Sequence, residues 1–249
     1  MNKVLEVKNL SKIYQTKKEN ISAIRDISFD IKEGEIIAIV GSSGCGKSTL
    51  LSILSGLEQK TDGQIIFSKE NFTIGYMLQN DALFEWRTIL DNALIGLEIN
   101  KNKTTENIDY VKKLLKTYGL ESFAHKYPNE LSGGMKQRVA LIRTLAIKPD
   151  LLLLDEPFSA LDYQTRLAVS DDVYKIIKNE KKTVIMVTHD LAEAISLADR
   201  VIVLSKRPCI VKKIYDIKLT NKSTPIENRK TKEFSDYYEK IWRDLDVFI

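Results

Sequence analysis

The chain has 249 residues, a length that fits one α/β domain with a sizeable buried core. Its 43% apolar and 29% charged residues are typical of a globular protein and exclude a disordered one. The net charge of +4 is too small and too dispersed to indicate a nucleic-acid partner. The two cysteines lie far apart, the first residues are charged too early for a signal peptide, and no apolar run could span a bilayer. We therefore expect a protein of a reducing, intracellular compartment.

Apolar alternation near the start of the chain predicts two antiparallel strands, at residues 4–7 and 24–31, joined by a loop at 17–20. Further strands are predicted where short apolar runs end in polar residues, at 36–40, 64–67, 73–78, 151–154, 183–187, 201–204 and 210–215. Helical spacing occurs between them, at 47–57, 161–179 and 191–197. Strands that alternate with helices predict an α/β fold whose parallel sheet is covered by helices.

Two segments depart from this alternation. From about residue 88 to 148 the periodicity is mostly helical and ends at Pro149, which predicts a helical subdomain inserted into the α/β core. The tail, about 221–249, is polar at first and helical over 231–245. It is too short for a separate domain, so residues 1–249 are predicted to form one domain. We expect the last helix to pack on the core through Phe234, Tyr238, Ile241 and Trp242.

The strongest motif is a glycine-rich loop between a predicted strand and a predicted helix. It matches G-x-x-x-x-G-K-[ST] at Gly41, Ser42, Ser43, Gly44, Cys45, Gly46, Lys47, Ser48 and Thr49. The glycines let backbone N–H groups point at phosphate oxygens, and the start of the helix attracts the same anion. Lys47 can neutralise the β- and γ-phosphates, and the Ser48 hydroxyl can ligate Mg²⁺. The alternative is a chance match of the motif in a glycine turn. The position of the loop between a predicted strand and a predicted helix favours a phosphate-binding loop over that alternative.

Polar side chains follow three other predicted strands. Gln79, the pair Asp155 and Glu156, and His189 each come after one of them. Because ligands of open α/β sheets bind at the carboxyl edge, we expect these groups beside the phosphate loop. Asp155 can hold Mg²⁺, and Glu156 can act as the general base toward a water molecule. A polar strand end is common, but the convergence of four strand ends predicts a nucleoside triphosphatase.

A third motif, Ser132 followed by Gly133 and Gly134, lies within the predicted helical subdomain. Serine is a preferred residue at the start of a helix, and the glycines allow close approach of the backbone. The segment can therefore bind an anion at a helix N-terminus. When the segment is considered alone, an ordinary helix cap is the better explanation.

The order of these motifs resembles the nucleotide-binding subunit of ATP-binding cassette (ABC) transporters over about residues 3–215. The elements that carry the resemblance are the phosphate loop, Gln79, Leu131 to Gly134, Asp155 with Glu156, Ser159 to Asp162, and His189. The resemblance implies a P-loop NTPase core of the RecA type, with an antiparallel β subdomain and an inserted α-helical subdomain.

The resemblance also implies how the site works. Two copies would close head to tail over two ATP molecules, so that Ser132, Gly133 and Gly134 contact the γ-phosphate at the partner subunit's Lys47. Tyr14 would stack on adenine, and Asp162 would help the two sites communicate. Lys47, Gln79, Glu156 and His189 are the expected catalytic residues, and Ser48, Gln79 and Asp155 are the expected Mg²⁺ ligands.

Partners follow from the same resemblance. The apolar residues within 76–88 fit either packing inside the helical subdomain or an exposed docking surface. The resemblance implies that this region meets a membrane permease at the cytoplasmic face, and that a solute-binding protein acts indirectly. The amino-acid sequences of several segments are similar to those of importers of nitrate, sulfonates and taurine. This group also has relatives that handle vitamin precursors. The alternatives are an exporter or lipid-extraction ATPase, an ABC protein of DNA repair or translation, and an inactive scaffold. The single cassette, the short segment 50–130 and the intact catalytic residues argue against the last two.

Overall fold

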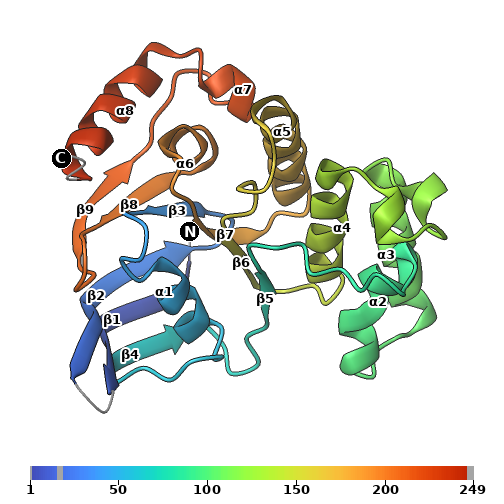
Figure 1. Cartoon of the computed structure of the whole chain (residues 1–249), viewed down its shortest axis with the longest axis horizontal. Coiled ribbons are helices and arrows are strands. Elements are labelled where there is room, and N and C mark those ends of the chain that lie inside the picture. Colours follow the sequence, from blue (N-terminus) through green and yellow to red (C-terminus); the bar gives the residue numbers. More distant parts are fainter. Residues whose placement is uncertain (1, 16–18, 246–249) are drawn as a thin grey trace.

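The computed structural model of the protein describes residues 2–15 and 19–245. Its centre is a sheet with the strand order β5-β6-β7-β3-β8-β9 (Figure 1). These strands are β3 (Ile36–Val40), β5 (Ile74–Met77), β6 (Leu151–Asp155), β7 (Thr183–Val187), β8 (Arg200–Leu204) and β9 (Val211–Asp216). Neighbours from β5 to β8 pair in parallel, whereas β8 and β9 pair antiparallel. The carboxyl ends of the parallel strands therefore meet at one edge of the sheet.

A second, antiparallel sheet with the order β2-β1-β4 shares a hydrophobic core with one face of the first. Its strands are β1 (Lys3–Gln15), β2 (Asn20–Lys32) and β4 (Asp62–Phe67). β1 and β2 are antiparallel, as predicted, but longer than predicted. A register shift between Val7 and Leu10, with a positive φ of 50° at Asn9, interrupts the alternation that marks a strand. Of the loop predicted at 17–20, residues 17 and 18 lie outside the described residues, and Asn20 begins β2.

β3 is buried along its whole length because its two faces belong to two different cores. Ile37 and Ile39 pack in the core shared with β1, β2 and α1 (Lys47–Leu54). Ile36, Ala38 and Val40 pack in the other core, which the helices of the opposite face cover. β6 and β7 show the same continuous burial. The strands predicted at 36–40, 151–154 and 183–187 are therefore confirmed to within one residue.

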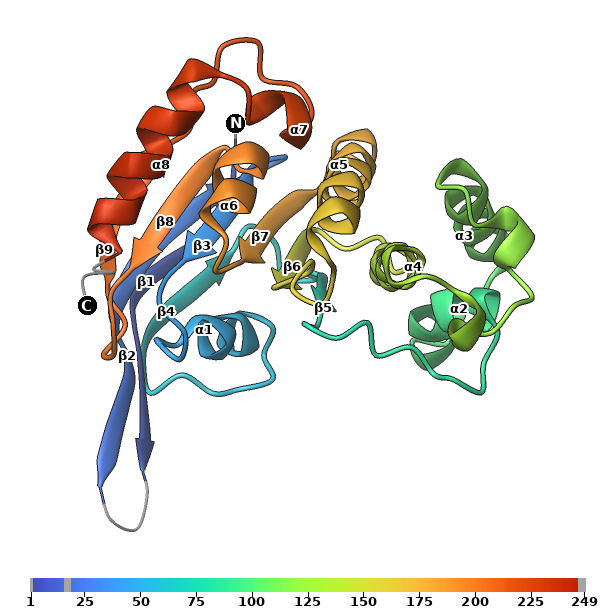
Figure 2. The same cartoon turned by 45° about the horizontal axis from the view of Figure 1, so that its top comes forward.

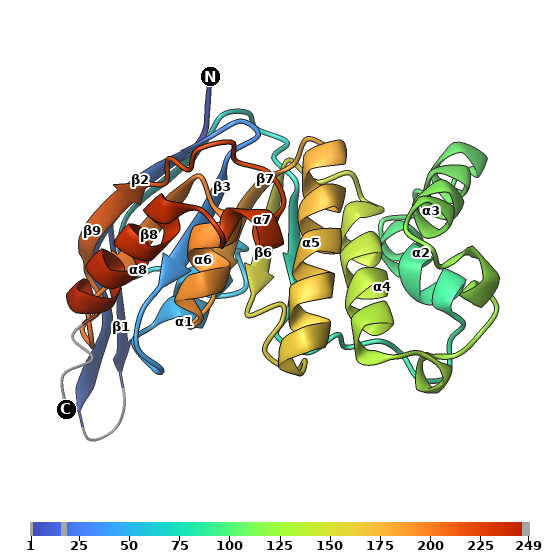
Figure 3. The same cartoon turned by 90° about the horizontal axis from the view of Figure 1, so that it is seen from above.

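Helices cover both faces of the parallel sheet and extend away from it at one end of the molecule (Figures 2 and 3). Those near the sheet include α1, α5 (Tyr163–Asn179) and α6 (Leu191–Leu197), and the group at the far end contains α2 (Ile89–Ile99), α3 (Thr105–Thr117) and α4 (Gly133–Leu145), with 3₁₀ turns at Glu121–Phe123 and Pro128–Glu130. α1 ends at Leu54 rather than at residue 57, because Gly56 adopts a positive φ of 79°. α5 begins at Tyr163 rather than at residue 161, because the Asp162 side chain caps it by accepting from the Thr165 N–H.

The C-terminal segment forms α7 (Pro225–Asn228) and α8 (Lys232–Asp244), which lie over α6 and the β8–β9 end of the sheet (Figure 3). Ile241 is fully buried, and Phe234 packs partly against the core, as predicted. The prediction was wrong for Tyr238 and Trp242, which are 36% and 45% exposed and stack on each other at 6.2 Å. The contacting face of α8 is narrower than its apolar pattern suggests. Within residues 2–15 and 19–245, the structure contains no helix of the length and apolarity that crossing a bilayer requires.

Candidate active site

The loop that follows β3 has a backbone that only glycine accommodates at its key positions. Gly44 and Gly46 adopt positive φ values of 72° and 129°. A Cβ atom on Gly46 would lie 3.2 Å from the Ala23 carbonyl oxygen, and one on Gly41 would lie 2.9 Å from Cys45 Sγ. The loop is therefore wrapped too tightly for a side chain at Gly41 or Gly46. Such a wrap brings backbone N–H groups together in a concave nest that suits phosphate oxygens.

α1 begins at Lys47, directly after this loop. Gly46 occupies the N-cap position and offers no side-chain hydrogen bond, so the first N–H groups of α1 have no cap from this residue. Lys47 is only 6% exposed, and its ammonium donates to the carbonyls of Gly41 at 2.9 Å and Ser42 at 3.2 Å. The positive charge of Lys47 is thus held inside the loop, where it joins the helix N-terminus in favouring an anion.

A hydroxyl and a carboxylate meet beside Lys47. Ser48 Oγ donates to Asp155 Oδ1 at 3.3 Å, and the Tyr76 hydroxyl donates to Asp155 Oδ2 at 3.2 Å. Burial raises the pKa of Asp155 above its ordinary value, against the effect of both hydrogen bonds. A bound cation would offset that burial, and oxygen donors are the ligands that Mg²⁺ prefers. Ser48 and Asp155 therefore fit the role predicted for them.

Glu156 follows Asp155 and has an unusual backbone. Its φ is 46°, a conformation that costs free energy for a residue other than glycine, and its N–H donates to the Val187 carbonyl at 2.9 Å. Its Oε2 atom lies 3.0 Å from His189 Nδ1 and 3.4 Å from Gln79 Nε2. Side chains that follow three different strands thus meet, with Gln79 and His189 both facing one oxygen of Glu156, as the motif positions predicted. A carboxylate held in this way can accept a proton from a bound water molecule.

A cavity of about 400 Å³ opens at this edge of the sheet. Its walls include the loop residues Gly41 to Ser43 and His189 on one side, and Tyr238 and Trp242 of α8 on another. The aromatic pair that was expected in the core thus faces the active-site edge. Sequence reasoning also missed Tyr76, whose place one strand from Asp155 becomes visible only in the pairing of β5 with β6.

The other predicted residues lie elsewhere. Ser132 is the N-cap of α4, as predicted, with its Oγ accepting from the Met135 N–H at 3.3 Å. In each view β5 and β6 lie between α4 and α1 (Figures 1 to 3). Gly134 is buried, and a Cβ atom there would lie 2.7 Å from Val169 Cγ2 on α5. Tyr14 lies in the β1–β2 hairpin, under Lys12 Nζ at 4.7 Å from its ring centroid.

The fold and the edge of its sheet define a P-loop nucleoside triphosphatase, since a nested loop, a buried lysine and a carboxylate pair meet there. The model of the family described as ABC transporter matches residues 24–159, more than half of the sequence. The chain belongs to the ABC transporter family and is an ATP-binding, ATP-hydrolysing cassette.

Known proteins similar to this chain cover almost all of it. The uncharacterized ABC transporter ATP-binding protein YtlC of Bacillus subtilis is 42% identical over 97% of this chain and 95% of its own. The nitrate import ATP-binding protein NrtD of a Synechocystis species is 38% identical over 95% of this chain and 93% of its own. The dimeric post-hydrolysis structure of the cassette MJ0796, bound to ADP and Pi, superposes with a TM-score of 0.72 at 32% identity, over 86% of this chain and 99% of that one.

Proposed function

We propose that the chain is the motor of an ABC importer and that it works as a head-to-tail homodimer with ATP between the two copies. The observation that carries this proposal is the position of Ser132. Because β5 and β6 lie between α4, which Ser132 caps, and α1, which Lys47 begins, we expect a nucleotide at Lys47 to lie out of reach of Ser132 of the same copy. A second copy can supply Ser132, Gly133 and Gly134 from outside. The solved dimer of the MJ0796 cassette supports this arrangement.

The chemistry follows from the groups at the edge of the sheet. Lys47 would exchange the carbonyls of Gly41 and Ser42 for the β- and γ-phosphates of ATP. Glu156 would take a proton from the water that attacks the γ-phosphorus, while the bond to the oxygen of ADP breaks. His189 would hold the Glu156 carboxylate through their 3.0 Å contact. The products are ADP and inorganic phosphate.

The remaining site residues have supporting roles. Mg²⁺, held by Ser48, Asp155 and Gln79, would neutralise charge on the phosphates. Tyr14 would stack on adenine, for which its half-buried ring offers a face. Asp162 would link the two nucleotide sites, because it caps α5 directly after the loop that follows Glu156.

Import is supported by the relatives. Proteins 35–39% identical to this chain are named as nitrate, taurine and aliphatic sulfonates import ATP-binding proteins. The cargo would be a small solute of this kind or a vitamin precursor. It would pass through a separate membrane permease, fed by a solute-binding protein, with this chain on the cytoplasmic face. Trp86 is 75% exposed, and its ring centroid lies 5.1 Å from that of Phe84. The exposed Trp86 ring supports a docking surface for the permease near the start of α2.

The substitution Glu156→Gln tests the motor. We expect the variant to bind ATP and form a stable dimer in light scattering, while its ATP turnover falls by at least about 100-fold. Lys47→Ala is the matched control, since it should remain monomeric with ATP. Full ATPase activity of Glu156→Gln would overturn the assignment of the general base.

The direction of transport needs a second experiment. The chain would be reconstituted in vesicles with the permease and the solute-binding protein encoded beside it. ATP-driven uptake of labelled taurine, nitrate or a vitamin precursor is expected when the binding protein is present. Transport in the opposite direction, without a binding protein, would instead support an exporter.

A further inference from the structure

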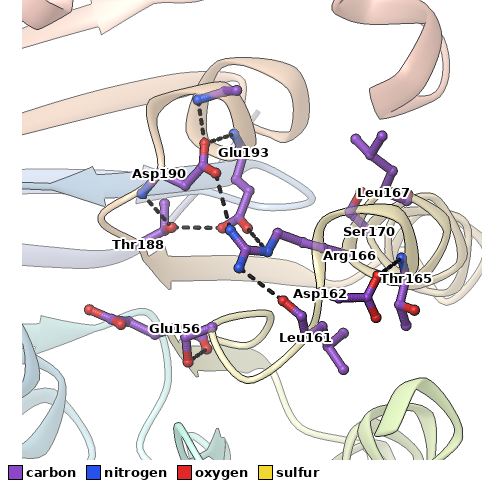
Figure 4. Close-up of polar contacts among 12 residues, drawn as sticks. Glu156, Leu161, Asp162, Thr165, Arg166, Leu167, Ser170, Thr188, Asp190 and Glu193 are labelled. Atoms are coloured by element: carbon purple, nitrogen blue, oxygen red, sulfur yellow. Dashed lines mark hydrogen bonds and ion pairs between the residues drawn. The ribbon is translucent and has the colours of Figure 1, made fainter. Parts of the chain in front are cut away.

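Arg166 lies on the first turn of α5 and reaches both loops that carry the hydrolytic residues (Figure 4). Its Nη2 atom donates to the Leu161 carbonyl at 3.0 Å, in the loop that follows Glu156. Its Nη1 atom lies 3.5 Å from Asp190 Oδ2, and its Nε atom lies 3.8 Å from Glu193 Oε1. Asp190 directly follows His189. A single guanidinium therefore connects the segment after the general base with the turn that holds the histidine.

The turn around His189 is tied together by its own hydrogen bonds. Thr188 Oγ1 donates to Glu193 Oε2 at 2.7 Å and accepts from the Asp190 N–H at 3.0 Å. Asp190 Oδ1 accepts from the N–H groups of Ala192 at 2.7 Å and Glu193 at 3.1 Å (Figure 4). The residues on both sides of His189 are thus fixed to the start of α6. Arg166 forms ion pairs with two acids of this unit, Asp190 and Glu193.

The loop on the other side is also continuous. The Glu156 carbonyl accepts from the Ser159 N–H at 3.1 Å and from Ser159 Oγ at 3.0 Å. The Leu161 N–H donates to the Phe158 carbonyl at 3.2 Å, and the Arg166 N–H donates to the Asp162 carbonyl at 2.8 Å. The strained φ of Glu156 persists only when such surroundings hold it. The Leu161 carbonyl is where Arg166 contacts this loop.

Arginine suits this position because its planar fork offers several donors in fixed directions. The Arg166 side chain is 23% exposed, and Glu193 beneath it is 3% exposed, so water screens the pair only partly. A lysine could reach one of the two loops as a point charge. It could not donate to the Leu161 carbonyl and face both acids with the same geometry.

We propose that Arg166 is a positioning residue for ATP hydrolysis, which sets His189 against Glu156 by holding their two loops in one arrangement. This inference rests on the roles proposed above for Glu156 and His189. Within the described residues, the hydrogen bond and ion pairs of Arg166 go to Leu161, Asp190 and Glu193, and none goes to the side chain of Glu156 or His189. A misplacement of about 1 Å in a catalytic group can lower the rate by on the order of 100-fold. Removal of Arg166 should therefore lower kcat and leave the binding of ATP by the phosphate loop nearly unchanged.

The test compares Arg166→Ala and Arg166→Lys with the parent chain in steady-state ATPase assays. We expect kcat to fall on the order of 10- to 100-fold for Arg166→Ala and less for Arg166→Lys, with KM for ATP within about threefold. The control is Arg200→Ala. Arg200 is 13% exposed and bonds Glu35 Oε1 and the Asp30 carbonyl at the amino end of β8, the edge opposite to the active site. It should lower Tm but leave kcat per folded molecule unchanged.

A double-mutant cycle separates positioning from a purely structural role. In single-turnover assays, Arg166→Ala should lower the hydrolysis rate only slightly when His189→Ala is already present, because the group that Arg166 positions is then absent. An additive loss, or a loss of total activity that disappears when the rate is expressed per folded molecule, would overturn the proposal. If Arg166→Ala keeps full kcat while Glu156→Gln loses it, the proposal that Arg166 positions the site is wrong, whereas the proposed role of Glu156 as general base is supported. If both keep full kcat, the proposed hydrolytic roles fail first.

Discussion

His189 Nδ1 lies 3.0 Å from Glu156 Oε2, although the two residues follow different strands and are separated by 33 positions. The pairing of β6 with β7 brings these strand ends together. Glu156 is the more sheltered partner, with 18% of its side chain exposed against 56% for His189. The imidazole is therefore the more solvent-exposed member of this pair.

The first prediction concerns this contact. His189→Ala should lower kcat for ATP hydrolysis by about 100-fold, because the carboxylate loses the group that orients it. KM for ATP should change by less than about threefold, since the phosphate loop is untouched. His125, the other histidine of the chain, is exposed and lies between the 3₁₀ turns at Glu121–Phe123 and Pro128–Glu130, so His125→Ala is the control and should retain full activity. Equal kcat for the two variants would contradict the role of His189.

The second prediction concerns the two thiols. A hydrogen bond from Cys209 holds the pKa of Cys45 below its ordinary value, with a further contribution from the Lys47 ammonium and against the effect of burial. The rate of Cys45 alkylation, followed by mass spectrometry, should therefore rise with pH and reach its midpoint below the ordinary range of thiols. Cys209→Ala should move this midpoint upward by more than about one pH unit, toward the ordinary range of thiols. ATP should protect Cys45, and an unchanged midpoint in Cys209→Ala would refute the coupling.

The third prediction concerns stability and pH. Burial raises the pKa of Glu193 from 4.5 to about 7, assisted by Asp190 and opposed by the Thr188 hydrogen bond and by Arg166 and Arg229. A raised carboxyl pKa means that the folded chain binds the proton more tightly than the unfolded chain. The resulting stability is present below pH 4.5 and is lost as the pH rises to about 7.

Glu193→Gln removes this titration. The unfolding free energy of Glu193→Gln minus that of the parent should increase by about 2 kcal/mol from pH 5 to pH 7.5. Urea denaturation at the two pH values measures the difference. A constant gap between the two proteins at both pH values would show that Glu193 does not titrate in this range.

The fourth prediction separates packing from binding at Gly134. Gly134→Ala should destabilise the fold by about 1–3 kcal/mol, because its Cβ would lie 2.7 Å from Val169 Cγ2. The double variant Gly134→Ala with Val169→Ala removes the clash and should recover part of that loss in thermal unfolding. No recovery would mean that the cost arises from the helix start itself rather than from the contact between α4 and α5.

The fifth prediction concerns the proposed docking surface. Trp86→Ala should leave the unfolding free energy within about 0.5 kcal/mol and the ATPase activity of the isolated chain unchanged, because the ring is 75% exposed. Coupled transport in vesicles should fall, since an exposed aromatic ring is a typical anchor at an interface. Leu57, which is 72% exposed just beyond α1, is the matched control, and Leu57→Ala should transport normally. Normal transport by Trp86→Ala would argue against this surface.

Much of the active-site edge could be predicted because its strands are buried on both faces. β3, β6 and β7 appear as unbroken apolar runs, and the residues after them lie at the same edge of the parallel sheet. The link from Arg166 to Glu193 could not be predicted in this way. The two residues belong to different helices, 27 positions apart, and no local periodicity relates them. Their meeting depends on how α5 and α6 pack.

The apolar pattern of α8 misled for a different reason. Spacing shows which residues share a helix face but not how much of that face the neighbouring elements cover. Ile241 lies at the centre of the contact and is fully buried, whereas Trp242 lies at its border and remains 45% exposed. The width of a buried stripe is set by tertiary structure and is not encoded in the helix alone.

The position of β5 and β6 between α4 and α1 has a kinetic consequence. If each nucleotide needs residues of two chains, the hydrolysis rate of dilute free chains rises with the square of their concentration. A permease that anchors two copies side by side makes the encounter intramolecular, at an effective concentration on the order of millimolar. Assembly on the membrane would then by itself raise the rate of ATP hydrolysis, and free chains would hydrolyse little cellular ATP.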